Sequence, residues 1–263
     1  MSILAGVDAI IDRHLGVADV GSSSPHHRHR TSALRLSQGR PMGFDALSLL
    51  EESYARLVAN LERSPRFLAK GPSAENWRFE KQLGLSARNT SPETTLERAI
   101  ASAAGKDWAN QVPAASGLWD HVADKRRAVD LVRRIGEQSF ELIELKVDSD
   151  TPLRAVVEIV QYGLLYALAR ERYPEWERKG KELLQAKEVH LRVLAPVAYY
   201  NPFLLRWLED DLDAAVRAFA EARFGEPLLA SFRCEAFPAD FVWPGPSSGV
   251  LDRLHRRSRV WTQ

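Results

Sequence analysis

The stretch AVDLVRRIGEQSFELIELKV, residues 128–147, constrains the fold of this chain more than any other segment. Two apolar runs flank a Gly-Glu-Gln turn, a pattern typical of a β-hairpin. If the turn centres on Glu137, Ile135 lies opposite Ser139. That register fixes which side chains of the two strands face each other, because side chains alternate between the faces of a sheet.

In this register Asp130 lies directly opposite Glu144. Glu144 and Lys146 are two residues apart, so they project from the same face of their strand. Two carboxylates and an ammonium group would therefore converge on one face of a sheet, which is the arrangement that a divalent metal and an activated water require. The opposite face would carry core residues: Val129, Leu131, Ile143 and Leu145.

Composition limits the class of protein. The chain has 263 residues, of which 45% are hydrophobic and 27% charged, enough for one large domain or two small ones. Its net charge is only +1, so a nucleic-acid partner would have to be bound by a local basic surface. The single cysteine, Cys234, excludes an internal disulfide framework and favours a reducing, cytoplasmic location. We expect no membrane span, because no apolar run looks long enough.

The second half of the chain predicts an α/β fold with the order α-β-β-β-α-β-α-β. A strand hairpin that leads into a strand–helix–strand crossover gives a mixed β-sheet with flanking helices on both faces. Ser91 and Pro92 are typical of the start of the first helix. The expected elements are a helix at 91–105, a strand near 108–115, hairpin strands at 127–135 and 139–147, a helix at 153–170, a strand in 188–200, a helix in 201–225 and a strand in 228–238.

The remaining segments divide as follows. Residues 1–45 are expected to form an N-terminal helix followed by a flexible linker, since Gly, Ser, Pro and Arg dominate 18–45. Residues 46–90 form a mostly helical N-terminal extension, 91–240 the core, and 241–263 a basic C-terminal tail. The tail is the best local candidate for phosphate contacts through Arg253, Arg256, Arg257 and Arg259.

The region from about Glu93 to Pro238 resembles the PD-(D/E)xK nuclease superfamily, which has the restriction-endonuclease-like fold. The resemblance consists of Asp130, thirteen intervening residues and then Glu144-Leu145-Lys146, together with the order of elements. It implies a restriction-endonuclease-like mixed sheet and a metal-dependent nuclease. Two positions depart from the family pattern: Val129 stands where proline is common, and Leu165 fills a tyrosine position of the subgroup related to RecB.

The resemblance also implies roles for the site residues. Mg²⁺, or Mn²⁺ as a substitute, would be held by Asp130, Glu144 and the main-chain carbonyl of Leu145. Lys146 would orient or help to deprotonate the attacking water, or stabilise the phosphorus as charge develops. These are oxygen ligands, which hard cations prefer.

Two further polar residues are candidates. Glu97, on the first helix of the core, could supply another carboxylate or could be a plain exposed helix residue, and Glu93 one turn earlier competes for the site role. Gln161, among apolar neighbours, needs a partner and could point into the site or cap a nearby carbonyl.

Each feature has an alternative interpretation. Asp130, Glu144 and Lys146 could instead form a cross-strand ion pair on a solvated sheet face, although both strands look buried. The cluster His26-His27-Arg28-His29-Arg30 suggests metal binding or a nucleic-acid arm, but a disordered polar tract is favoured. We therefore expect a nuclease acting on nucleic acid, DNA being favoured over RNA, and double-strand cutting would favour a homodimer. The alternative is a non-catalytic relative that binds nucleic acid or a protein partner.

Overall fold

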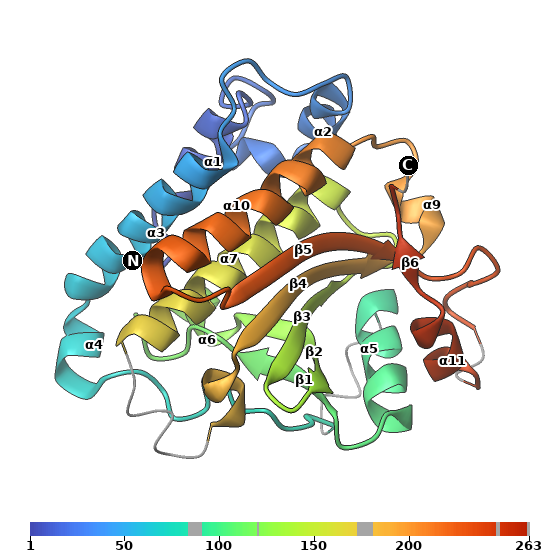
Figure 1. Ribbon diagram of the computed structural model, residues 1–263. Coiled ribbons are helices and arrows are strands. Elements are labelled where there is room, and N and C mark those ends of the chain that lie inside the picture. Colours follow the sequence, from blue (N-terminus) through green and yellow to red (C-terminus); the bar gives the residue numbers. More distant parts are fainter. Residues whose placement is uncertain (84–90, 120, 173–180, 246–247, 262–263) are drawn as a thin grey trace.

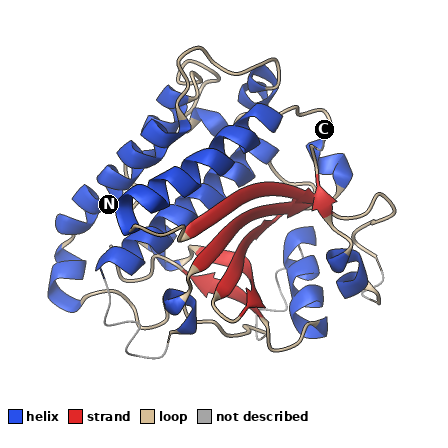
Figure 2. Cartoon of the chain, viewed as in Figure 1, coloured by secondary structure: helices blue, strands red, loops and turns tan. Residues whose placement is uncertain are grey.

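The described part of the chain folds around one open sheet of six strands in the order β1-β2-β3-β4-β5-β6 (Figures 1 and 2). The computed structural model describes residues 1–83, 91–119, 121–172, 181–245 and 248–261. The pairs β1/β2, β2/β3 and β5/β6 are antiparallel, whereas β3/β4 and β4/β5 are parallel, so the sheet is mixed. The strands are β1 (Trp108–Pro113), β2 (Ala128–Gly136), β3 (Ser139–Leu145), β4 (Glu188–Ala195), β5 (Leu229–Ala236) and β6 (Ser258–Arg259).

Helices cover both faces of the sheet. In Figure 1, α3, α7 and α10 lie over one face, and α5 and α11 lie against part of the other. The predicted α/β class, with a mixed sheet and helices on both faces, is confirmed. The helices are α1 (Val7–His14), η1 (His26–Arg28), α2 (Arg30–Leu36), α3 (Ala46–Glu62), α4 (Pro65–Lys70), α5 (Pro92–Ala103), α6 (Val122–Lys125), α7 (Pro152–Arg172), η2 (Glu182–Gln185), α9 (Val197–Tyr200), α10 (Arg206–Phe224) and α11 (Val250–His255).

The long elements of the core follow the predicted order, from α5 through β1, β2, β3, α7, β4 and α10 to β5. Local signals account for this agreement. The Ser91 hydroxyl accepts a hydrogen bond from the Thr94 N–H, and Pro92 occupies the first turn of α5. Helix α5 ends at Ala103, two residues before Gly105, where the sequence predicted its end.

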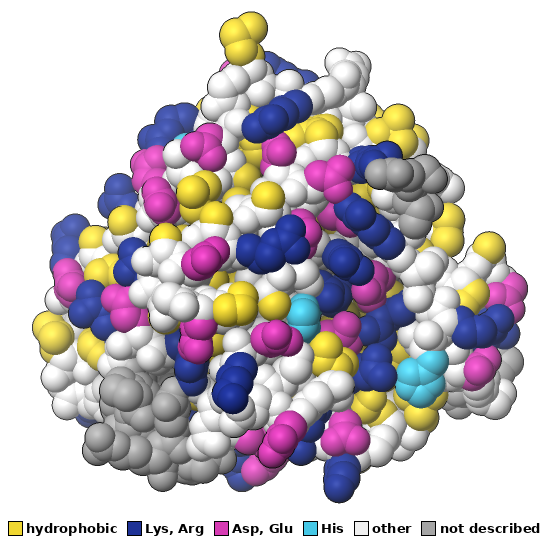
Figure 3. Space-filling model, in the orientation of Figure 1, with side chains coloured by type: hydrophobic (Ala, Val, Ile, Leu, Met, Phe, Trp, Pro, Cys, Tyr) yellow, Lys and Arg dark blue, Asp and Glu magenta, His cyan; other side chains and the backbone are white. Residues whose placement is uncertain are grey.

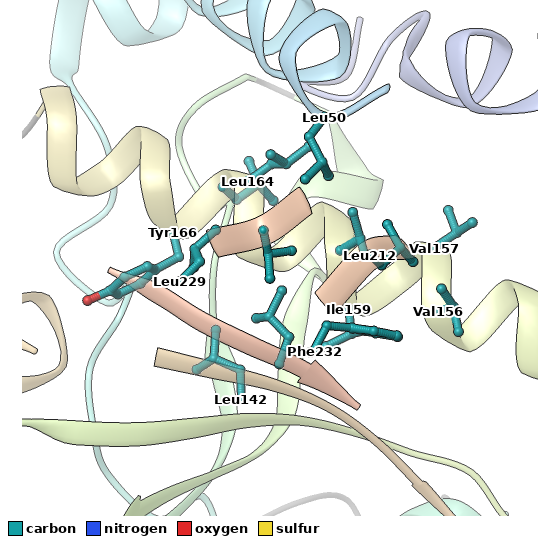
Figure 4. Close-up of a cluster of buried hydrophobic side chains, with 14 of the residues drawn as sticks. Leu50, Leu142, Val156, Val157, Ile159, Leu164, Tyr166, Leu212, Leu229 and Phe232 are labelled. Carbon is teal, nitrogen blue, oxygen red and sulfur yellow. The ribbon is translucent and has the colours of Figure 1, made fainter. Parts of the chain in front are cut away.

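Most of the fold shares one hydrophobic core between the sheet and the layer of α3, α7 and α10. Figure 4 shows Leu50 of α3, Ile159 of α7 and Phe232 of β5 meeting in this core. Ile3 and Val7 near the N-terminus belong to the same cluster and are fully buried. The N-terminal segment is therefore packed onto the same core as the strands.

Helix α7 owes its apolar composition to this core. Among the described residues it is the one helix long and apolar enough to cross a membrane, with 21 residues and a mean hydropathy of 1.2. However, 83% of its apolar window is buried inside the fold. The expectation that no apolar run reaches such a length is thus wrong, and packing against the sheet explains the run as a core helix.

The predicted flexible linker at 18–45 is also wrong. This segment contains η1 and α2, and His27 is 1% exposed. The Asp12 carboxylate of α1 accepts hydrogen bonds from the N–H groups of His26 and His27 and contacts the His27 ring at 2.7 Å. The polar composition suggested disorder, but a single buried carboxylate from another helix supplies the partners that fix the segment.

Replacing Asp12 tests this packing. Asp12→Ala should lower the free energy of unfolding by about 2–4 kcal/mol, because it leaves the buried N–H and imidazole of His27 and the half-buried N–H of His26 without their acceptor. Urea denaturation measures the change. Asp19→Ala is the control, since the Asp19 carboxylate pairs with Arg35 at an exposed position and should matter by less than about 0.5 kcal/mol. Equal, small effects of both changes would contradict the packing described for Asp12.

The expected basic tail at 241–263 is docked onto the sheet over its described residues, 241–245 and 248–261. Arg257 pairs with Glu141 and Glu235, and Arg259 with Glu209 and Asp210. Acidic partners also lie beside the other two arginines: Asp240 beside Arg253, and Asp240 and Asp252 beside Arg256. Basic and acidic side chains are interspersed over the face in Figure 3. The tail therefore offers phosphates less free positive charge than the sequence suggested.

Candidate metal and catalytic site

The β2–β3 hairpin brings Asp130 and Glu144 together. Leu131 pairs with Ile143, so the adjoining Asp130 and Glu144 occupy facing positions, as the sequence predicted. The predicted pairing of Ile135 with Ser139 is wrong, because Ser139 pairs with Gly136. The register shifts between Arg134 and Gly136, next to the turn, and the strand ends that carry the carboxylates keep the predicted register.

The carboxylates lie on the α7 side of the sheet. Val132 and Leu142, each two residues from a carboxylate and so on the same face, belong to the main core under α7. The predicted core residues of the opposite face are buried as well. Leu131, Ile143 and Leu145 form a second cluster with α5, and Val129 joins the main core.

Lys146 is held between two carboxylates. Its ammonium lies 2.7 Å from Oε1 of Glu144 and 2.9 Å from Oε2 of Glu158, which belongs to α7. Burial alone would lower the pKa of Lys146, but Glu144, Glu158 and Asp130 raise it well above its usual value. Lys146 is therefore a cation at neutral pH, which favours orientation and charge stabilisation over proton abstraction.

Asp130 and Glu144 are crowded by negative charge. Oδ2 of Asp130 accepts a hydrogen bond from the Leu145 N–H at 2.9 Å. Burial raises the pKa of Asp130 to about 6, and the charge of Glu158 adds to this, against the opposing effect of Lys146. Burial and the charge of Asp130 raise the pKa of Glu144 well above its usual value. A cation between the two carboxylates would relieve this repulsion.

Of the two candidate glutamates on α5, Glu97 is connected to Asp130 through hydrogen bonds of Gln111, and Glu93 is not. Glu97 is 3% exposed, and Gln111 donates to it at 2.7 Å while the same amide lies 3.4 Å from Oδ1 of Asp130. Burial raises the pKa of Glu97 to about 7, with a further contribution from Asp130. Glu93 instead accepts the N–H groups of Val147 and Ser149, so it fixes the loop that follows β3.

Gln111 was missed by the sequence analysis. Its backbone φ is 49°, a left-handed conformation that is costly for a residue other than glycine. In that conformation its amide bridges Glu97 and Asp130. The neighbouring Asn110, which is fully buried, donates to the other Glu97 oxygen at 2.7 Å. The sequence signal that could have identified Asn110 and Gln111 was the presence of two adjacent amide side chains inside the short strand β1.

Helix α7 places Glu158 and Tyr162 near the candidate site, and not the predicted Gln161. Among the described residues, the Gln161 amide donates to Asp8 of α1 at 2.8 Å, so it neither reaches the carboxylates nor caps a carbonyl. Glu158 and Tyr162 lie nearer the site: burial raises the pKa of Tyr162 well above its usual value, with contributions from Glu144 and Asp130. The sequence signal for Glu158 was a single acidic residue within an apolar stretch of α7, because a buried acid needs a partner.

The donor atoms suit a hard cation. Two carboxylates and the Leu145 carbonyl are oxygen ligands, and Mg²⁺ is commonly bound through one or two carboxylates while water and substrate phosphates complete its shell. Within the part of the chain that the structure describes, no group of three or more His, Cys, Asp and Glu side chains is arranged to hold a metal ion. The candidate site therefore depends on ligands from the main chain and the substrate.

Comparison of the chain with protein-family models, with curated proteins and with solved structures gives no significant match.

Proposed function

We propose that this protein is a metal-dependent nuclease of the PD-(D/E)xK type, with a restriction-endonuclease-like core. The observation that carries the proposal is the hairpin, which places Asp130 opposite Glu144 with Lys146 on the same face and in contact with Glu144. Glu97 joins this group through Gln111, at the position where the resemblance implies a further carboxylate. The order of elements from α5 to β5 supports the same proposal.

Each residue has a distinct role in phosphodiester hydrolysis. Asp130, Glu144 and the Leu145 carbonyl would hold Mg²⁺ or Mn²⁺, which acidifies a water and neutralises charge on the phosphate when bound. The Lys146 ammonium orients the attacking water and stabilises charge that develops on the phosphate. Glu97, with a pKa of about 7, can accept or donate a proton near neutral pH.

One observation favours the alternative of a protein that binds without cutting. Glu144 is only 4% exposed and Lys146 only 8%, so a substrate has limited access to them. Such a protein would bind nucleic acid or a protein partner and would not depend on metal.

A cleavage assay separates the two functions. End-labelled single-stranded DNA, double-stranded DNA and RNA are incubated with the protein and Mg²⁺ or Mn²⁺. We expect DNA to be cut, and EDTA to stop the reaction. Binding without cleavage of any of these substrates would favour the alternative. DNA as the preferred substrate, a homodimer for double-strand cutting and a cytoplasmic location are parts of the same proposal.

Metal affinity should depend on pH. Metal ligands must be deprotonated, and the pKa of Asp130 is about 6 with that of Glu144 also raised. Protons therefore compete with the metal below about pH 6, and affinity rises as the pH increases through this range. Lowering the pH from about 7.5 to 5.5 should weaken Mn²⁺ binding by about tenfold in calorimetric titrations. An affinity that does not change over this interval would contradict these assignments.

A further inference from the structure

Glu158 is fixed at both of its carboxylate oxygens. Oε2 lies 2.9 Å from the Lys146 ammonium, and Oε1 lies 3.4 Å from Nε of Arg154, one turn earlier on α7. Arg154 in turn pairs with Asp150 at 2.7 Å. Charges of alternating sign thus run from the start of α7 through Lys146 to Glu144 on β3.

The Lys146 ammonium is therefore shared between two carboxylates, that of Glu144 on β3 and that of Glu158 on α7. The ammonium is 2.7 Å from the Glu144 carboxylate, which the proposed function requires as a metal ligand. If Glu158 lost its charge, Glu144 would be the one charged carboxylate still in contact with the Lys146 ammonium among the described residues. The ion pair would then compete directly with a cation for the Glu144 oxygens.

We infer that Glu158 is a positioning residue of the site: it shares the Lys146 ammonium with Glu144 and so weakens the competition of that ammonium with a divalent cation for the Glu144 oxygens. The inference rests on the proposed function. In this role Glu158 acts through Lys146 and needs no contact with metal or substrate, although its carboxylate also lies in hydrogen-bond contact with Glu144. The neighbours of a metal ligand commonly alter metal affinity or activity by about 10–100-fold when they are replaced.

A double-mutant cycle on Mn²⁺ affinity tests this role without requiring cleavage. The variants are Glu158→Gln, Lys146→Met and the combination, each measured by calorimetric titration after its fold is checked by circular dichroism. Glu158→Gln should weaken Mn²⁺ binding by about tenfold when Lys146 is present. In the Lys146→Met background the same change should have almost no effect, because the competing ammonium is gone.

Two further variants complete the design. Glu158→Asp keeps the charge and should recover most of the lost affinity, which a purely structural role would not predict. Glu171→Gln is the matched control, since Glu171 lies on the same helix and pairs with Arg223 at 2.9 Å. It should leave Mn²⁺ affinity unchanged.

The outcomes are distinguishable. An equal loss in both backgrounds would show that Glu158 acts without Lys146, by binding the metal, by its direct contact with Glu144 or by supporting the fold, and would overturn the inference. So would the absence of any loss in Glu158→Gln while the wild type binds Mn²⁺, although the proposed function would stand. A wild-type protein that binds no Mn²⁺ would remove both the proposed function and the inference.

Discussion

Lys146→Ala should abolish nucleic-acid cleavage, with a loss of about 10³-fold or more. The ammonium is the positive charge that contacts Glu144, and it remains protonated at neutral pH because three carboxylates surround it. In the proposed mechanism, its removal eliminates the group that orients water and stabilises the phosphate. Initial rates on end-labelled DNA measure the effect.

The stability of the Lys146→Ala variant must be measured at the same time. Glu144 loses the ammonium it pairs with, and Glu158 keeps only Arg154, so we expect a cost of about 1–3 kcal/mol in the free energy of unfolding. Lys146→Arg keeps the charge but not the geometry of an ammonium, so it should retain the fold and still lose cleavage. Lys187→Ala, at an exposed position, is the control. Cleavage at the wild-type rate by either Lys146 variant would contradict the assigned role.

Asp130→Asn should stabilise the fold at neutral pH while it removes metal binding. The pKa of Asp130 rises from 3.8 to about 6 on folding, so its ionised form is less favourable in the folded protein than in the unfolded chain. Ionisation therefore reduces stability as the pH rises from about 4 to 6. Asparagine avoids this, and the gain should reach about 1–3 kcal/mol above pH 6.

The pH dependence identifies the cause of the gain. Urea denaturation at pH 4 and pH 7.5 should show little difference between Asp130→Asn and wild type at the lower pH and the full gain at the higher one. Asp107→Asn, at an exposed carboxylate just before β1, should change neither value. A loss of stability in Asp130→Asn at pH 7.5 would instead mean that Lys146 compensates the ionised carboxylate fully.

Local patterns made the core elements predictable. The alternation of apolar residues fixed the register at Leu131 and Ile143, and the Ser91-Pro92 cap fixed the start of α5. Both signals depend on residues close together in the sequence. The predicted pairing at the turn is wrong because the strand register shifts by one residue between Arg134 and Gly136, which the apolar pattern does not reveal.

The contacts that the sequence did not reveal depend on packing between elements that are far apart in the sequence. Glu158 reaches Lys146 because α7 has a particular rotation over the sheet, and the same rotation turns Gln161 toward Asp8 of α1. Gln111 reaches Glu97 through an unusual backbone conformation. The segment around His27 folds because Asp12, fifteen residues earlier, supplies its hydrogen-bond acceptor. None of these contacts follows from local propensity.

The central claim is that Asp130 and Glu144 form a divalent-metal site. Calorimetric titration of Mn²⁺ into the wild-type protein and into the Asp130→Asn, Glu144→Gln double variant tests it most directly, because both substitutions preserve side-chain size. We predict saturable binding by the wild type at pH 7.5 and none by the double variant. Equal binding by both proteins, or none by the wild type even with DNA present, would contradict the claim.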